Sequence, residues 1–231
     1  MGQGFQFIDI IFFALIAGFI LLRLRSVLGT RSGNEKRPED AIRRQKTPSP
    51  DERRDDNVVR LPGSETEGWA SDESMGIVPD SPLAQSLTEI QLIDRSFNPQ
   101  YFLTGARQAY EMIISAFAKG DRETLRPLLN DDVFAQFDAA ISERETQNQS
   151  METELVRMAD VRMADATLND TMAEITVKFS VELISAVRNA DGAILQGHPT
   201  VPQEVSELWT FARDIGSKDP NWLLIATTPA E

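Results

Sequence analysis

The residue types that usually perform catalysis are scarce in this sequence. It contains one histidine, His198 in the stretch GHPT, and no cysteine. A single His between Gly and Pro is typical of a turn rather than of a general base, and without a His or Cys cluster we expect no zinc or other transition-metal site. The sequence has no Gly-rich phosphate loop and no Ser-centred nucleophile elbow. It therefore predicts a protein that is not an enzyme and that uses no cofactor or metal.

Helices are predicted first along the folded part of the chain. Leu83, Leu87 and Ile90 recur at helical spacing in a short segment. Asn98, followed by Pro, is a favourable start for a long helix that Gly120 would end. Two further helices are predicted in RETLRPLL and in DDVFAQFDAAISERETQ.

Strands are predicted after the helices. In MAEITVKFSVEL the apolar residues alternate with polar ones, which indicates a strand with one buried face. The predicted strand 153–167 contains VRMAD twice, and this five-residue offset predicts a β-bulge. EVSELWTFARDI and NWLLIATT add two strands. The predicted fold class is therefore α+β, with helices packed on one face of a curved antiparallel sheet in residues 81–231.

The N-terminal stretch could be a cleaved export signal, a helix on the membrane surface or a permanent anchor. Residues 5–22 contain only Gln6 and Asp9 as polar side chains. The run is long enough for a membrane-spanning helix, which takes roughly 17–25 residues. A cleaved signal would carry positive charge before the run, and a surface helix would have a charged face. We therefore predict an uncleaved single-pass anchor over residues 1–28. Its apolar side chains include Phe12, Phe13, Leu15, Ile16, Phe19 and Leu22.

Charge predicts the orientation of this anchor. Arg23, Arg25 and Arg31 follow the apolar run. The positive-inside rule places them at the inner leaflet and the rest of the chain in the cytoplasm, or in the equivalent matrix compartment of an organelle. Residues 29–80 are rich in Pro, Ser, Gly and charged residues, which predicts a disordered linker.

Charge also limits the partners. Residues 23–60 contain eleven Lys and Arg against seven Asp and Glu, whereas residues 61–231 contain twelve against twenty-eight. We expect no nucleic-acid binding by the acidic part, because such binding needs Lys and Arg to neutralise phosphates. The basic segment can contact anionic lipid of the inner membrane.

Two stretches resemble the Tim44-like domain family. One is the helix pair with the pattern A-[YF]…I…AF-x-x-G-D-x-x-x-L-x-x-L-L, which falls on residues 109–129. The other is the hairpin pattern W-T-F-x-R…W-x-L, which falls on residues 209–224. The resemblance covers residues 82–231. The short anchor is more similar to bacterial members than to the mitochondrial import-motor subunit, which has a long chaperone-binding N-terminal region.

The resemblance implies a cone-like domain similar to nuclear transport factor 2, with an apolar cavity between sheet and helices. Large aromatic residues dominate such cavities, but they also build ordinary cores, and both interpretations stay open. The candidate cavity-lining residues are Tyr110, Ile114, Phe117, Phe179, Trp209, Phe211 and Trp222.

The resemblance also implies that the first helix of the domain contacts a membrane or a partner. Its candidate residues are Leu83, Leu87 and Ile90, and the alternative is that they pack on their own domain.

These observations predict an adaptor or scaffold anchored in the bacterial inner membrane. It would recruit unidentified membrane or cytoplasmic proteins, in a role related to protein translocation or membrane-protein assembly, and its cavity would take lipid or hydrophobic peptide. One alternative is a periplasmic scaffold similar to secretion-system components. Another is a small-molecule enzyme of the same fold, which requires a buried Asp, Glu or Tyr that the sequence pattern does not single out.

Overall fold

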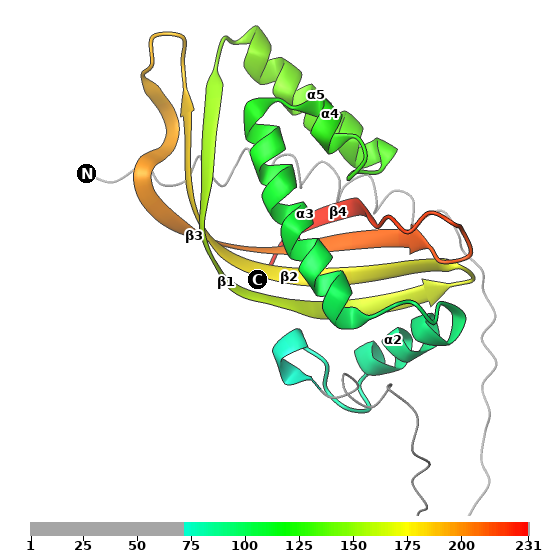
Figure 1. Ribbon diagram of the computed structural model, residues 1–231. Coiled ribbons are helices and arrows are strands. Elements are labelled where there is room, and N and C mark those ends of the chain that lie inside the picture. The colour runs from blue at the N-terminus through cyan, green and yellow to red at the C-terminus, as the bar shows by residue number, and fades with distance from the viewer. Residues whose placement is uncertain (1–71, 231) are drawn as a thin grey trace, which may run out of the picture.

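The computed structural model describes residues 72–230 (Figure 1). The predicted anchor and most of the predicted linker lie outside these residues. Among residues 72–230, no helix combines the length and the apolar character that crossing a membrane requires.

One antiparallel sheet forms the centre of the domain, with the strand order β1-β2-β3-β4. The strands are β1 Ser150–Asn169, β2 Met172–Arg188, β3 Ile194–Asp214 and β4 Leu223–Pro229. Strands that follow one another in sequence are neighbours in the sheet, so the sheet is a meander. The first three strands bend, and their far ends rise beside the helices (Figure 1). We call this part the arm; it consists of residues 150–158, 182–188 and 194–205.

Helices cover one face of the sheet, as the sequence predicted. They are η2 Glu73–Met75, α2 Pro82–Ile93, α3 Pro99–Lys119, α4 Arg122–Leu125 and α5 Asp131–Thr146. α2 and α3 contact β1, and α5 contacts β4. Figure 1 shows α3 crossing the sheet diagonally. The fold class predicted from sequence is thereby confirmed for the described part of the chain.

Local sequence explains where the helices begin. Each α-helix starts after a residue whose side chain accepts a hydrogen bond from a backbone N–H of the first turn. These residues are Ser81, Asn98, Asp121 and Asn130. α3 also ends where predicted, at Gly120, whose φ of 72° lies in the left-handed region that Gly adopts without a steric penalty.

Three features of the fold differ from the prediction. The domain begins before residue 81, because Met75 and Ile77 are buried in its core. α4 is only four residues long. Pro127 follows closely, and Pro has no backbone N–H with which to continue the helical hydrogen bonds. His198 lies in β3, paired with Ser185, rather than in a loop.

The buried face of β2 follows the predicted alternation, and its buried residues from 173 to 181 are Ala173, Ile175, Val177, Phe179 and Val181. The predicted bulge is also present. Three shifts in the β1–β2 register fall between residues 155 and 165, across the repeated VRMAD. Within residues 72–230, β1 has no strand on its other side. Bulges of this kind twist an edge strand and hinder its pairing with other chains.

A short parallel β-bridge connects β4 to the segment between α4 and α5. Leu129 pairs with Leu224. The Leu224 N–H donates to the Leu128 carbonyl at 2.8 Å, and the Asn130 N–H donates to the Leu224 carbonyl at 3.0 Å. The segment between α4 and α5 is therefore held in place by β4.

Gly197 allows β3 to pass close to β2. Its φ is 75°, and a Cβ at this position would lie 2.0 Å from the Ser185 carbonyl oxygen. We expect Gly197→Ala to lower the free energy of unfolding by at least about 1 kcal/mol, because the side chain meets both a steric clash and an unfavourable φ. Urea unfolding measures this change.

Gly192→Ala is the matched control for this prediction. Gly192 also has a positive φ, 81°, but a Cβ there would have no neighbour within 4 Å. Equal effects of the two substitutions would show that the close approach to Ser185 contributes nothing.

Candidate functional site

Glu207 is the buried carboxyl group of the domain. Its side chain lies on the inner face of β3, and the residue is 4% exposed. The Trp209 indole N–H donates to Oε2 of Glu207 at 3.0 Å, and the Tyr110 hydroxyl donates to the same oxygen at 3.3 Å. Since Tyr110 belongs to α3, Glu207 links the central helix to the sheet.

Burial changes the acidity of both groups. Desolvation raises the pKa of Glu207 from 4.5 to about 7, although the hydrogen bonds from Trp209 and Tyr110 favour the ionised form. Burial and the negative charge of Glu207 raise the pKa of Tyr110 well above its usual value, so the phenol keeps its proton. Near neutral pH the carboxyl group of Glu207 can therefore gain or lose a proton, whereas the hydroxyl group of Tyr110 remains a hydrogen-bond donor.

Three aromatic rings pack around this carboxyl group. Tyr110 lies 4.6 Å from Phe179 and 4.5 Å from Trp209, measured between ring centroids. All three residues are at most 1% exposed. The low polarity of these rings explains why the charged form of Glu207 is disfavoured.

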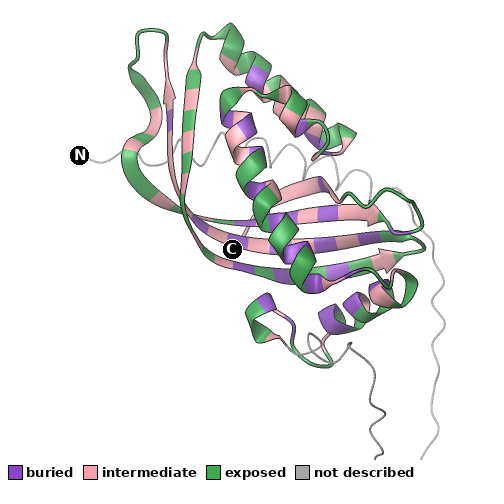
Figure 2. Cartoon of the chain, in the orientation of Figure 1, coloured by how far each residue is buried: buried purple, intermediate pink, exposed green. Residues whose placement is uncertain are grey.

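Burial decreases along the sheet from Glu207 toward the arm. On β3, Phe211, Trp209 and Glu207 are buried, whereas Val205 is only half-buried. Figure 2 shows that most buried positions lie in the lower part of the sheet and that the arm is mainly intermediate or exposed. Glu207 is therefore the last buried inward residue of β3 before the arm.

An apolar surface continues beyond Glu207 on the sheet and the helices. We call it the inner apolar surface and define it by six half-buried residues that pack against the core. They are Leu155, Leu183 and Val205 on the sheet and Ile114, Phe117 and Phe137 on the helices.

Two arginines connect the helices that carry Phe117 and Phe137 of this surface. Arg144 on α5 donates to the carbonyl oxygen of Phe117 at 2.6 Å, and its guanidinium lies 5.0 Å from the centroid of the Phe117 ring. Arg122 forms ion pairs with Asp138 at 2.6 Å and with Glu145 at 2.9 Å. α3, α4 and α5 are thereby joined, which fixes Phe117 against Phe137, with ring centroids 4.9 Å apart.

The structure divides the seven predicted cavity-lining residues into two groups. Tyr110, Phe179, Trp209 and Phe211 are buried core residues, at most 2% exposed. Ile114, Phe117 and Trp222 are half-buried. Of these three, Trp222 packs against a different part of the same core, 4.8 Å from the ring of Phe102. Only Ile114 and Phe117 belong to the inner apolar surface.

The predicted partner face of the first helix is part of the core. Leu83, Leu87 and Ile90 are at most 7% exposed, and α2 contacts β1. The alternative that these residues pack on their own domain is therefore what the structure shows. The exposed apolar residues of α2 are instead Leu92 and Ile93, which are 72% and 54% exposed.

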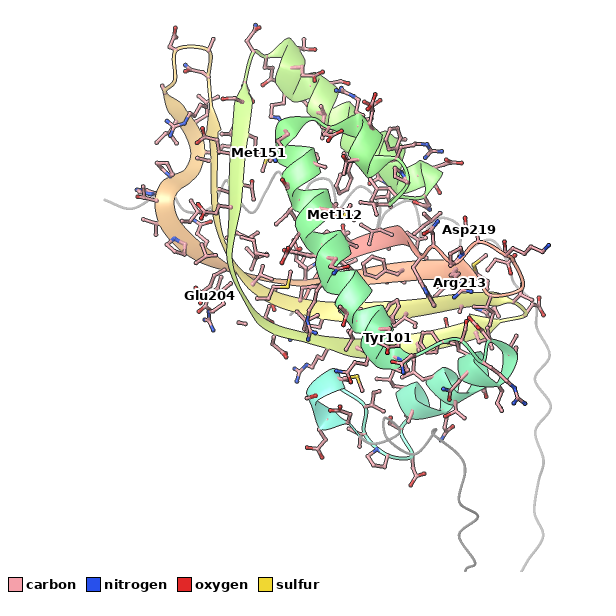
Figure 3. All side chains as sticks on the ribbon, viewed as in Figure 1. Tyr101, Met112, Met151, Glu204, Arg213 and Asp219 are labelled. Atoms are coloured by element: carbon pink, nitrogen blue, oxygen red, sulfur yellow. The ribbon has the colours of Figure 1, made fainter. Side chains whose placement is uncertain are left out.

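An ion pair fixes the end of α2. Arg213 on β3 lies 3.0 Å from Oδ2 of Asp94, the residue that follows α2. Figure 3 shows Arg213 beside Asp219, whose carbonyl accepts a hydrogen bond from Arg213 at 3.2 Å. Desolvation would raise the pKa of Asp94, but hydrogen bonds from Ser96 and the charge of Arg213 hold it below the ordinary value.

Arg213→Met tests this ion pair. We expect a loss of about 1–3 kcal/mol in the free energy of unfolding, because Asp94 would stay largely buried without its counter-charge. Hydrogen exchange should show weaker protection in α2. Adding Asp94→Asn should recover part of the loss, and no recovery would mean that Arg213 acts only through packing.

Other predicted residues lie outside the described part of the chain. These are Phe12, Phe13, Leu15, Ile16, Phe19, Leu22, Arg23, Arg25 and Arg31. Within residues 72–230, no group of three or more His, Asp and Glu residues is arranged to hold a metal ion.

Sequence reasoning missed Glu207, although a signal was present. In EVSELWTF, Val205, Glu207 and Trp209 share one face by strand periodicity. An acid between two inward apolar residues indicates a buried carboxyl group. Its partner Tyr110 comes from a helix far earlier in the sequence, so alternation alone does not identify the pair.

Comparison with known proteins places the domain in a family. The sequence profile of the Tim44-like domain matches residues 83–229. The probable mitochondrial import inner membrane translocase subunit tin-44 of Caenorhabditis elegans is 25% identical over 140 residues, which cover 60% of this chain and 33% of the relative. The mitochondrial import inner membrane translocase subunit TIM44 of Mus musculus is 19% identical, with 71% of this chain and 37% of the relative covered.

The matched segment thus spans about a third of the length of these curated relatives. Among solved structures, the intermembrane space region of chloroplast protein ARC6 has a TM-score of 0.38 and 13% identity, covering 55% of this chain and 94% of that chain. A likeness this low carries no argument about function. The profile match extends over more than half of the 231 residues and over nearly all of the described domain. The chain therefore belongs to the Tim44-like domain family.

Proposed function

We propose that this protein is an adaptor anchored in the bacterial inner membrane, which recruits membrane or cytoplasmic proteins for protein translocation or membrane-protein assembly. The observation that carries the proposal is the family match over residues 83–229 together with curated relatives that are import translocase subunits. The apolar run and the arginines at the N-terminus support a single-pass anchor with the domain in the cytoplasm.

The geometry of the domain supports binding rather than catalysis. Its buried carboxyl group accepts hydrogen bonds from Tyr110 and Trp209, and Tyr110 is the only titratable residue that bonds to it among the described residues. The inner apolar surface offers half-buried aliphatic and aromatic side chains instead, which suit lipid or hydrophobic peptide.

Proximity labelling tests this proposal. A labelling enzyme is fused to the C-terminus of the full chain, and a matched chain lacks residues 1–28. We expect labelling of cytoplasmic and membrane proteins that is lost without residues 1–28. Labelling of periplasmic proteins would overturn the topology and favour a periplasmic scaffold.

A further inference from the structure

Glu207 has one carboxylate oxygen that no described side chain occupies. The hydrogen bonds from Tyr110 and Trp209 both end on Oε2. No described residue donates a hydrogen bond to Oε1 of Glu207, and the residue as a whole is 4% exposed.

This oxygen lies where the core meets the inner apolar surface. Val205 follows Glu207 on the inner face of β3 and is half-buried. On β2 the burial decreases two residues further along, from Val181, which is buried and pairs with Val205, to Leu183, which is half-buried. A chain that lies on the inner apolar surface could therefore end at Glu207.

We propose that Glu207 is the polar end of a ligand site, and that the ligand is a lipid-like aliphatic chain that carries a primary ammonium group. This inference rests on the proposed role of the inner apolar surface and adds the chemical class of its ligand. The aliphatic chain lies on the inner apolar surface, and the ammonium donates to Oε1.

The hydrogen-bonding chemistry of the Glu207 carboxylate favours an ammonium group as the polar end of the ligand. An ionised carboxylate only accepts hydrogen bonds, and an ammonium only donates them. Tyr110 and Trp209 already donate to the other oxygen, so a donor at Oε1 completes the coordination of the carboxylate. A hydrogen bond between charged groups is also roughly twice as strong as one between neutral groups.

The charge of the domain disfavours an anionic ligand. Residues 61–231 carry sixteen more Asp and Glu than Lys and Arg. This excess attracts cations and repels anions during association. The two arginines near the inner apolar surface are already engaged, Arg144 by carbonyl oxygens and Arg122 by carboxylates.

The test uses octylamine, octanol and octanoate as probes of equal chain length. The full-length chain, kept in lipid nanodiscs, is titrated with each probe after partition into empty nanodiscs has been measured. The readout is the NMR signal of the Trp209 indole N–H, because this group donates to Glu207. The three Trp signals are assigned with single Trp→Phe variants.

Glu207→Gln is compared with Glu204→Gln as a matched control. Gln keeps an oxygen that can accept from Tyr110 and Trp209. Glu204 lies three residues away on the same strand, is exposed and points outward from the bent sheet (Figure 3). Both substitutions remove one negative charge, so only a loss specific to Glu207 indicates a direct contact.

We expect octylamine to shift the Trp209 signal at lower concentration than octanol, and octanoate to bind least. Glu207→Gln should weaken octylamine binding about tenfold or more, which is the usual contribution of a hydrogen bond to a charged group. Octanol binding should change little, and Glu204→Gln should leave all three probes unchanged.

Affinity for octylamine should also rise as pH increases through about 7, because Glu207 then becomes ionised. Tyr110 is the other titratable group that faces this carboxyl group, and it stays protonated throughout. The partners of Glu207 on the neighbouring strands, Phe179 and Pro229, and its second donor, Trp209, do not titrate. This profile tests the proposal in the unmodified chain even if Glu207→Gln does not fold.

The outcomes separate this inference from the proposed function. Equal binding of octylamine and octanol, independent of Glu207, would overturn the ammonium site and leave the inner apolar surface as a binding surface. Equal weakening by Glu204→Gln would also overturn it, because bulk charge would then explain the preference. No response of Trp209 to any probe would reject the inner apolar surface as a ligand site but not the adaptor role, which proximity labelling tests separately.

Discussion

The free energy of unfolding of this domain should fall by about 3 kcal/mol as pH rises from 4.5 to 7, because of Glu207 alone. In the folded protein this carboxyl group holds its proton up to a pH of about 7, whereas in the unfolded chain it loses the proton near pH 4.5. The stabilisation is therefore fully present below pH 4.5. It is lost progressively as pH rises through about 7, and it changes no further above about pH 8.

Urea unfolding at several pH values between 4.5 and 8 measures this effect. Glu207→Gln should remove the decrease, and Glu204→Gln should retain it, because Glu204 is exposed. Parallel pH profiles for the wild type and Glu207→Gln would show that burial does not raise the pKa of Glu207.

Other acids act in a different pH range. Asp94, Asp121 and Asp214 have a pKa below the ordinary value of 3.8, and Glu145 has one below 4.5. Groups of this kind contribute stability that is present above their unfolded pKa and lost as pH falls. Their effect has the opposite sign and lies below the window in which Glu207 titrates.

Leu87→Ala should destabilise the domain by about 2–5 kcal/mol, because it removes a fully buried side chain between α2 and the sheet. Leu92→Ala makes the same chemical change in the same helix at a position that is 72% exposed. We expect this control to change stability by no more than about 0.5 kcal/mol.

Urea unfolding of both variants decides whether α2 belongs to the domain. A large loss for Leu87→Ala alone means that α2 is an integral part of it. Similar small effects of the two substitutions would mean that α2 is only loosely attached and could dock elsewhere through its apolar face.

The features that depend on local sequence were predictable. The starts of the helices follow from residues such as Asn98 and Asn130, since the same short segment supplies both the cap and the amide groups that it satisfies. The buried face of β2 follows from alternation within one strand. The bulges in β1 follow from the offset of its repeated sequence.

The features that depend on distant contacts were not predictable. Ile77 looks like part of a polar linker, and only its contact with the core shows that it belongs to the domain. Continuation of β3 through His198 depends on the close approach of Gly197 to Ser185. The Glu207–Tyr110 pair joins residues that are 97 positions apart, so no local pattern reveals it.

The bridge between Leu129 and Leu224 has a consequence for synthesis on the ribosome. The helices emerge first, but the strand that holds the segment between α4 and α5 is the last one of the domain to be made. A nascent chain without β4 leaves Leu129 and its neighbours without their backbone partners. The domain should therefore become protease-resistant only after β4 has left the exit tunnel, and until then its half-built core is a substrate for chaperones.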